Sequence, residues 1–160
     1  MLTLLSSFAR ADQLSEYQIK AGFLYNFATF TEWPQSVGNN LKLCIYGQDP
    51  FGKSIYDLDN KAVGKRLLTV RSDNSAAIDN CHIVFIATSA HAEITTITNK
   101  FKGKPILFVA DSPNATEQGV ALNMIKKNNR MVFEANLSAA RKNGLAISSR
   151  LLQMATKVVR

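Results

Sequence analysis

The segment Gly47–Ser54, GQDPFGKS, is the part of this sequence that best matches a motif with defined chemistry. It satisfies G-x-x-x-x-G-K-[ST], a phosphate-binding loop whose backbone N–H groups and lysine hold phosphates while the hydroxyl reaches magnesium. Its interior argues against that chemistry, because Asp49 adds a negative charge and Pro50 removes one N–H. We therefore favour a turn and helix start, with Asp49 as cap and Pro50 in the first helical position. A small nucleotide-binding protein that uses Gly47–Ser54 remains the alternative.

Cys44 and Cys81, 37 positions apart, are the two cysteines, and each lies on or beside an expected core strand. They can be buried thiols, a disulfide, or half of a metal site. A metal site is poorly supported, because the sequence has no C-x-x-C pair and its only histidines are His82 and His91. A disulfide is favoured if the protein is exported to an oxidising compartment, and buried thiols if it is cytosolic. Since no G-x-S-x-G elbow occurs either, we assign no catalytic residue, metal or cofactor.

The strand expected at residues 131–136 carries two polar side chains on one face. Period-two alternation places Glu134 and Asn136 on the face opposite Phe133. A carboxylate and an amide on one face of a core strand can bind a ligand or partner. They can equally bond the backbone of the next helix, with Asn136 as its cap, and both interpretations stay open.

An aromatic helix, Tyr17–Pro34, holds six of the fourteen aromatic residues of the chain. Ser15 can cap its first turn with Gln18 completing a capping box, and the proline ends it. Apolar residues cover well over half of the helix circumference, more than the stripe of roughly 100° that one core needs. The helix is therefore either buried on both sides or contacts another molecule, and we favour contact. The candidate partner or dimer surface consists of Tyr17, Phe23, Phe27, Phe30 and Trp33.

The N-terminus resembles the end of a signal peptide. Met1–Phe8 is a short apolar run, and Ala9–Ala11 forms an A-x-A cleavage pattern. We expect residues 1–11 to be a signal-peptide remnant or a disordered N-terminus, and residues 12–160 to be the folded domain. No run approaches the roughly 18 apolar residues of a membrane span. The net charge of +7 comes from scattered residues without aromatic–basic interleaving, which argues against a nucleic-acid partner.

The periodicity alternates between helix and strand along the chain. Strands are expected at 41–46, 66–71, 82–87, 106–110, 120–125 and 131–136, and helices at 90–101 and 137–143. A last helix, capped by Ser148 or Ser149, is expected to present an apolar face of Leu151, Leu152, Ala155, Val158 and Val159. This order predicts a single, three-layer-like α/β domain. Its mostly parallel sheet of about six strands would be flanked by helices and end in a C-terminal β-hairpin edge.

Four separated pieces resemble the YfiR family of exported bacterial proteins in the right order: EYQIKAGFLYNFATFTEWP, LCIYGQDPFG, CHIVFIA and RMVFEANLSAARKNGLAISSRLLQMA. The resemblance covers nearly all of residues 16–155. It implies a periplasmic regulator rather than an enzyme, with an α/β sheet flanked by helices and a dimeric state. It further implies sequestration of the periplasmic sensor domain of an inner-membrane diguanylate cyclase, which lowers cyclic di-GMP and biofilm formation. Direct membrane insertion is not implied.

The resemblance also implies roles for single residues. Cys44 and Cys81 match one cysteine pair of the family, whereas a second pair found in some members would fall near Thr116 and Asn123 and is absent. Any redox tuning is therefore expected to depend on the first pair.

Glu134 and Asn136 match the family pattern F-E-x-N. Together with Ser148 nearby, they are the candidate ligand or partner pocket. A periplasmic sensor of a small ligand bound near Glu134 is a further alternative.

Overall fold

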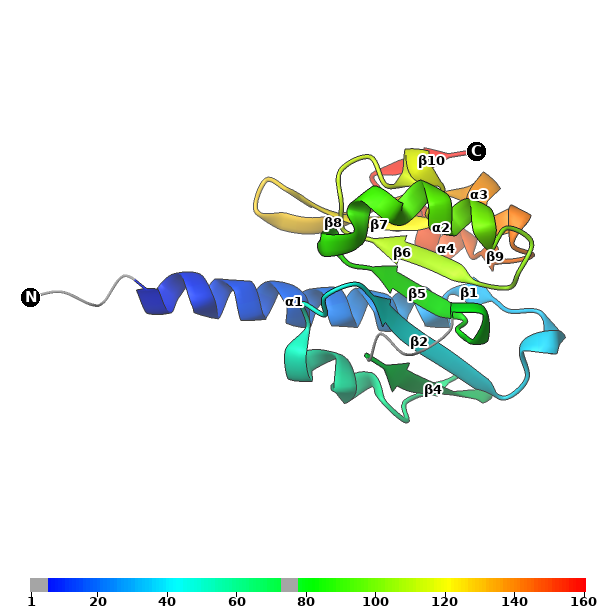
Figure 1. Ribbon diagram of the computed structural model, residues 1–160, viewed down its shortest axis with the longest axis horizontal. Helices are drawn as coiled ribbons and strands as arrows, with labels where there is room; N and C mark the ends of the chain where they lie inside the picture. Colours follow the sequence, from blue (N-terminus) through cyan, green and yellow to red (C-terminus); the bar gives the residue numbers. More distant parts are fainter. Residues whose placement is uncertain (1–5, 73–77) are drawn as a thin grey trace, which may run out of the picture.

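A mixed eight-stranded sheet forms the centre of the computed structural model, which describes residues 6–72 and 78–160 (Figure 1). The strand order is β10-β8-β7-β6-β5-β2-β4-β3. The strands are β2 (Asn40–Tyr46), β3 (Ala62–Val63), β4 (Arg66–Arg71), β5 (Ile83–Ile86), β6 (Leu107–Ala110), β7 (Leu122–Lys127), β8 (Arg130–Asn136) and β10 (Lys157–Val159). Strands β4, β2, β5, β6 and β7 are parallel, whereas β8 is antiparallel to β7 and β3 to β4.

The two central strands, β5 and β6, are buried on both faces. Their sequences, IVFI and LFVA, are continuous apolar runs, as expected for parallel strands covered from both sides. In β8, buried residues instead alternate with partly exposed ones, and Phe133 and Ala135 lie in the core. The mostly parallel α/β sheet predicted from the sequence is confirmed.

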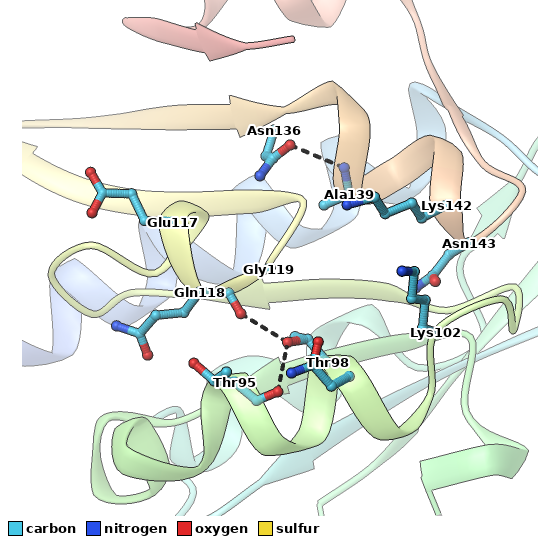
Figure 2. Close-up of a pocket in the computed structure, with 11 residues that line it drawn as sticks. Thr95, Thr98, Lys102, Glu117, Gln118, Gly119, Asn136, Ala139, Lys142 and Asn143 are labelled. Carbon is cyan, nitrogen blue, oxygen red and sulfur yellow. Dashed lines mark hydrogen bonds between the residues drawn. The ribbon is translucent and has the colours of Figure 1, made fainter.

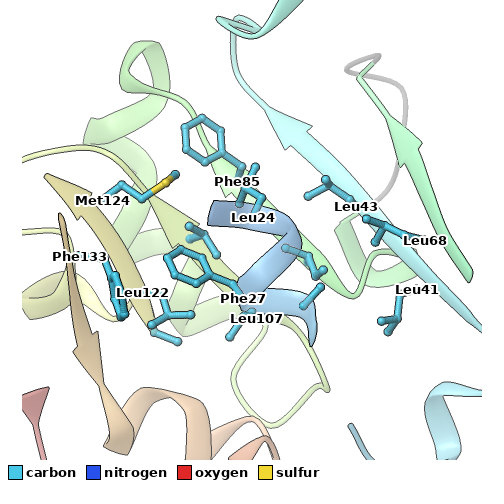
Figure 3. Close-up of a cluster of buried hydrophobic side chains, with 14 of the residues drawn as sticks. Leu24, Phe27, Leu41, Leu43, Leu68, Phe85, Leu107, Leu122, Met124 and Phe133 are labelled. Atoms are coloured by element: carbon cyan, nitrogen blue, oxygen red, sulfur yellow. The ribbon is translucent and has the colours of Figure 1, made fainter. Parts of the chain in front are cut away.

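Helices cover both faces of the sheet. The helices are α1 (Ser6–Thr29), α2 (Ile94–Lys100), α3 (Leu137–Lys142) and α4 (Ser149–Met154), with 3-10 turns η1 (Gln35–Val37), η2 (Gly52–Leu58), η3 (Ile78–Asn80), η4 (Thr88–Glu93) and η5 (Thr116–Gln118). The larger core cluster packs α1, α3 and α4 against one face, and the smaller packs α2 against the other. Figure 3 shows Leu24 and Phe27 of α1 among side chains from the sheet strands.

Helix α1 differs from the predicted aromatic helix at both ends. It begins at Ser6, so Ser15 lies inside it rather than at a cap, and its first turns extend beyond the sheet (Figure 1). It ends at Thr29 rather than at Trp33, because β1 (Thr31–Glu32) pairs with β9 (Ala146–Ile147). Residues 6–11 of the predicted signal-peptide remnant belong to α1, whereas residues 1–5 lie outside the described residues.

The C-terminus corrects the predicted last helix. Helix α4 ends at Met154, and Val158 and Val159 lie in β10, which pairs with β8. β-branched residues favour strands, and β8 offers an unpaired edge that β10 fills. Strand β10, and not the β7–β8 hairpin, therefore forms this edge of the sheet. Strands β1, β3 and β9 each have two residues, too few for a periodic signal.

Candidate functional site

The carboxyl ends of β2 and β5 flank a small pocket. From β2 the chain passes to β4 on one side, then crosses to β5 on the other, so the sheet has its topological switch point between β2 and β5. Open α/β sheets bind ligands at such a point. A pocket of about 240 Å³ lies here, lined by Tyr17, Gln48, Asp49, Pro50, Thr88 and Ser89. We call it the carboxyl-edge pocket.

A buried ion pair lies beside this pocket and joins α1 to the end of β6. Lys20 Nζ lies 2.8 Å from Asp111 Oδ2 and 3.2 Å from Glu16 Oε1. The Tyr17 hydroxyl donates to Asp111 Oδ2 at 3.0 Å, and Thr88 Oγ1 donates to Asp111 Oδ1 at 3.2 Å. Asp111 therefore holds together three segments that are distant in the sequence.

Burial, and then the negative charge of Asp111, raises the pKa of the Tyr17 phenol well above its ordinary value. Tyr17 therefore stays protonated and can act as the donor to Asp111. The sequence contains partial signals for this cluster: Asp111 follows an apolar strand, and Lys20 is a cation on a largely apolar helix. Nothing in the sequence indicates that Thr88 would contact Asp111.

The Gly47–Ser54 loop uses its own amides internally. The Gln48 N–H donates to Ser89 Oγ at 2.8 Å, the Phe51 N–H to Asp49 Oδ1 at 2.7 Å, and the Ser54 N–H to the Phe51 carbonyl at 3.2 Å. Asp49 thus forms the turn that leads into η2, which begins at Gly52 rather than at Pro50. Because three loop amides already have partners, the geometry supports the turn over a phosphate cradle.

Two of the three residues of the predicted Glu134 pocket cap helices. Asn136 Oδ1 accepts the Ala139 N–H at 3.0 Å at the start of α3, and its Nδ2 donates to the Thr116 carbonyl at 2.8 Å. Ser148 Oγ accepts the Leu151 N–H at 3.2 Å at the start of α4. Asn136 and Ser148 therefore cap helices, which is the structural alternative to ligand binding that the sequence left open. Glu134 is half-buried, in register with β7 and β10, and its role stays a prediction.

Asn136 also lines a second pocket, of about 260 Å³, between α2, η5 and α3 (Figure 2). Much of its polar lining is engaged within the chain: Thr98 Oγ1 donates to the Gln118 carbonyl at 2.8 Å. Asn143 donates to the Ile106 carbonyl at 2.9 Å and accepts the Gly103 N–H at 3.0 Å. These bonds join α2 to η5, and the end of α3 to the segment between α2 and β6, so the pocket walls are structural.

Phe27 corrects the predicted partner surface. Its side chain is fully buried, and its ring packs edge-on against Phe133 with centroids 5.1 Å apart. It therefore belongs to the core. Tyr17, Phe23, Phe30 and Trp33 are half-buried and pack against the same core, each keeping part of its surface exposed.

The exposed face of α1 carries no charged side chain between residues 17 and 29. It consists of Gln18, Ile19, Gly22, Asn26 and Thr29, and Ile19 is 49% exposed. Ile19, Phe23, Asn26 and Phe30 follow one another at i, i+4, i+7 and i+11, which aligns them along one side of the helix. We call these four residues the α1 stripe.

A disulfide joins Cys44 of β2 to Cys81, two residues before β5. Both cysteines are buried in the core cluster on the α2 side of the sheet. The bond therefore ties together the two strands that border the carboxyl-edge pocket. At the positions of the absent second pair, Thr116 begins η5, and buried Asn123 holds the backbone of Ser112.

Neither a metal site nor a membrane span emerges from the part of the chain that the structure describes. Within residues 6–72 and 78–160, no three His, Cys, Asp or Glu side chains gather to hold a metal ion. Among the helices described, none is both long and apolar enough to cross a bilayer.

Two comparisons place the chain among known proteins. A family model described as YfiR/HmsC-like matches residues 17–156. The crystal structure of a conserved domain protein from Vibrio cholerae O1 biovar El Tor str. N16961 matches with a TM-score of 0.54 at 9% identity. That match covers 89% of this chain but 60% of the other, so this chain spans about 60% of the length of the solved protein. At this identity the likeness shows the fold alone.

Proposed function

We propose that this chain, which belongs to the YfiR/HmsC-like family, sequesters the periplasmic domain of an inner-membrane diguanylate cyclase. Sequestration would keep the cyclase inactive and lower cyclic di-GMP and biofilm formation. The observation that carries this proposal is the family match, which extends over residues 17–156. This family is regulatory rather than catalytic and suggests a periplasmic location.

The α1 stripe is the proposed docking surface. An exposed helix face in a globular protein ordinarily carries charged residues, whereas this face has none between residues 17 and 29. Ile19 is half exposed, and Phe23 and Phe30 are partly exposed. A stripe of three apolar residues and one uncharged amide suits contact with another protein surface. Either the cyclase domain or a second copy of this chain in a homodimer would cover it.

The disulfide is the proposed redox element. Because it joins β2 to the segment before β5, its reduction to two thiols would loosen the pairing of these strands, whose opposite face packs against α1. Both cysteines are buried, so a reductant needs a local opening of the structure to reach them. We expect the oxidised form to bind the partner and the reduced form to release it.

Binding to purified periplasmic domains of candidate cyclases tests the proposal. We expect the oxidised wild-type chain to bind one such domain, and Ile19→Glu to weaken that binding at least 10-fold. Gln18→Glu is the matched control, since it adds the same charge to the same exposed helix outside the α1 stripe. Equal binding by wild type and Ile19→Glu, with unchanged dimerisation, would show that the α1 stripe is not the docking surface.

A further inference from the structure

The carboxyl-edge pocket presents several oxygen acceptors, beside the donor groups of Gln48 and Ser89. The carboxylate of Asp111 can only accept, so Tyr17 and Thr88 must each give it their single hydroxyl proton, at 3.0 Å and 3.2 Å. Both residues line the pocket. With their protons committed to Asp111, these two hydroxyl oxygens can only accept from a bound molecule.

Asp49 adds further acceptors to the same wall. Its Oδ1 accepts the Phe51 N–H at 2.7 Å, and its Oδ2 accepts the hydroxyl of Ser72. A carboxylate offers about four lone-pair sites, so capacity on both oxygens remains. The acceptor groups therefore come from three segments, namely α1, the turn after β2 and the turn after β5.

The pocket is also locally negative, although the whole chain has a net charge of +7. Glu16, Asp49 and Asp111 are acidic groups in or beside it, and the ammonium of Lys20 is held between Glu16 and Asp111. No lysine or arginine is among the described residues that line the pocket. One cation beside three carboxylates leaves an excess of negative charge.

We infer that the carboxyl-edge pocket binds a small molecule through a protonated primary amine, whose N–H groups donate to Tyr17, Thr88 and Asp49. A primary ammonium has three donors and no acceptor, which complements an acceptor-rich, negative wall. The volume of about 240 Å³ lies below the range of drug-sized sites, which suits a small metabolite. A calcium ion suits the pocket less well, because it takes about 6–8 oxygen ligands that include several carboxylates, and Asp49 is the one carboxylate in the lining.

This inference goes beyond the proposed function and does not depend on it. The amine site can exist whether or not the chain binds a cyclase, and its binding is measured without a partner protein. Its biological interest is that Tyr17 lies on α1, the helix that also carries the α1 stripe.

Titration of the full-length, ¹⁵N-labelled protein with ethanolamine hydrochloride at pH 7 and constant ionic strength tests the inference. We expect saturable shifts of amide signals at Tyr17, Gln48, Thr88 and Ser89, with a dissociation constant in the millimolar range. Sodium acetate and ethylene glycol, which lack the ammonium group, should leave these signals unchanged. Absence of saturable shifts with ethanolamine, or equal shifts with ethylene glycol, would overturn the inference.

Asp49→Asn supplies the decisive comparison. Its amide oxygen can still accept the Phe51 N–H, and its NH2 group can donate to the Ser72 hydroxyl oxygen, so the turn keeps its shape while the negative charge is lost. We expect ethanolamine to bind at least 10-fold more weakly. Asp57→Asn, at an exposed position of η2, makes the same charge change outside the pocket lining and should alter the affinity less than twofold. Equal weakening by both variants would show a general charge effect and contradict the site.

Thr88→Val provides a second test of the site, because this variant leaves the net charge of the protein unchanged. It removes one acceptor oxygen from the pocket and keeps the shape of the side chain. We expect ethanolamine to bind at least threefold more weakly. An unchanged affinity would exclude Thr88 from the site and contradict the proposed geometry, even if Asp49→Asn failed to fold.

Discussion

Lys20 on α1 and Asp111 after β6 form an ion pair of 2.8 Å whose side chains are 7% and 2% exposed. Removal of one partner from a buried pair leaves the other charge uncompensated, which costs about 3–5 kcal/mol. We expect Lys20→Met to lower the free energy of unfolding by about that amount. Urea denaturation with linear extrapolation measures it.

The double variant Lys20→Met/Asp111→Asn is the control for this prediction. It removes both charges, and the amide side chain that replaces the Asp111 carboxylate can still bond with the hydroxyls of Tyr17 and Thr88. We expect it to recover most of the lost stability. A loss below about 1 kcal/mol for Lys20→Met alone would mean that the pair does not fasten α1 to the sheet.

Truncation should destabilise the protein strongly at Phe27 and only weakly at Ile19. Phe27 is fully buried against Phe133, so Phe27→Ala is expected to cost about 3–5 kcal/mol of unfolding free energy. Ile19 is 49% exposed, and Ile19→Ala should cost less than about 1 kcal/mol. Thermal or urea unfolding of both variants checks this. Similar losses would contradict the orientation of α1 on the sheet.

Reduction of the disulfide should destabilise the protein. The cysteines are 37 residues apart, and the chain-entropy model gives about 4 kcal/mol for a loop of that length. We expect the urea midpoint to fall in reductant, and alkylation with intact-mass measurement to show two free thiols. Cys44→Ala/Cys81→Ala should have a low midpoint that reductant does not change further. A wild-type midpoint that stays constant despite complete reduction would refute this prediction.

His82 should make stability depend on pH. Burial first, and then the charges of Lys42 and Arg66, lower the pKa of His82 below its ordinary value, and its Nδ1 accepts the Lys42 N–H at 3.0 Å. As the pH falls below about 7, the unfolded chain takes up a proton that the folded protein resists, so stability decreases. The loss continues until the pH passes the folded-state pKa.

His82→Asn tests this origin directly, because the Asn oxygen can accept the same N–H but does not titrate. We expect the variant to lose the part of the pH dependence that His82 causes when urea unfolding is measured between pH 5 and pH 8. His91→Asn, at the other histidine, should retain it. The same slope in wild type and His82→Asn would show that another group is responsible.

The sequence predicted the central sheet because apolar runs such as those of β5 and β6 mark strands buried on both faces. It misassigned Val158 and Val159, since a short apolar segment fits either a helix or a strand. Val158 and Val159 form a strand because β8 offers a free edge, and that edge exists only in the folded sheet. Strands of two residues, such as β3, leave no periodic pattern at all.

The candidate sites were harder to predict for a related reason. The composition of α1 shows that its apolar surface is large, but only packing against Phe133 shows that Phe27 lies inside. The carboxyl-edge pocket joins Tyr17, Asp49 and Thr88, residues separated by many positions whose proximity follows from strand order. The disulfide was one of several open possibilities until the adjacent β2 and β5 brought the two cysteines together.

The intracellular concentration of cyclic di-GMP tests the central claim most directly. Cells that lack this chain would be complemented with the wild type, with Ile19→Glu, or with Gln18→Glu, each verified as folded and present in the periplasm. We predict a raised concentration without the chain, a low concentration with wild type or Gln18→Glu, and a raised concentration with Ile19→Glu. The same concentration with and without the chain would contradict regulation of a diguanylate cyclase.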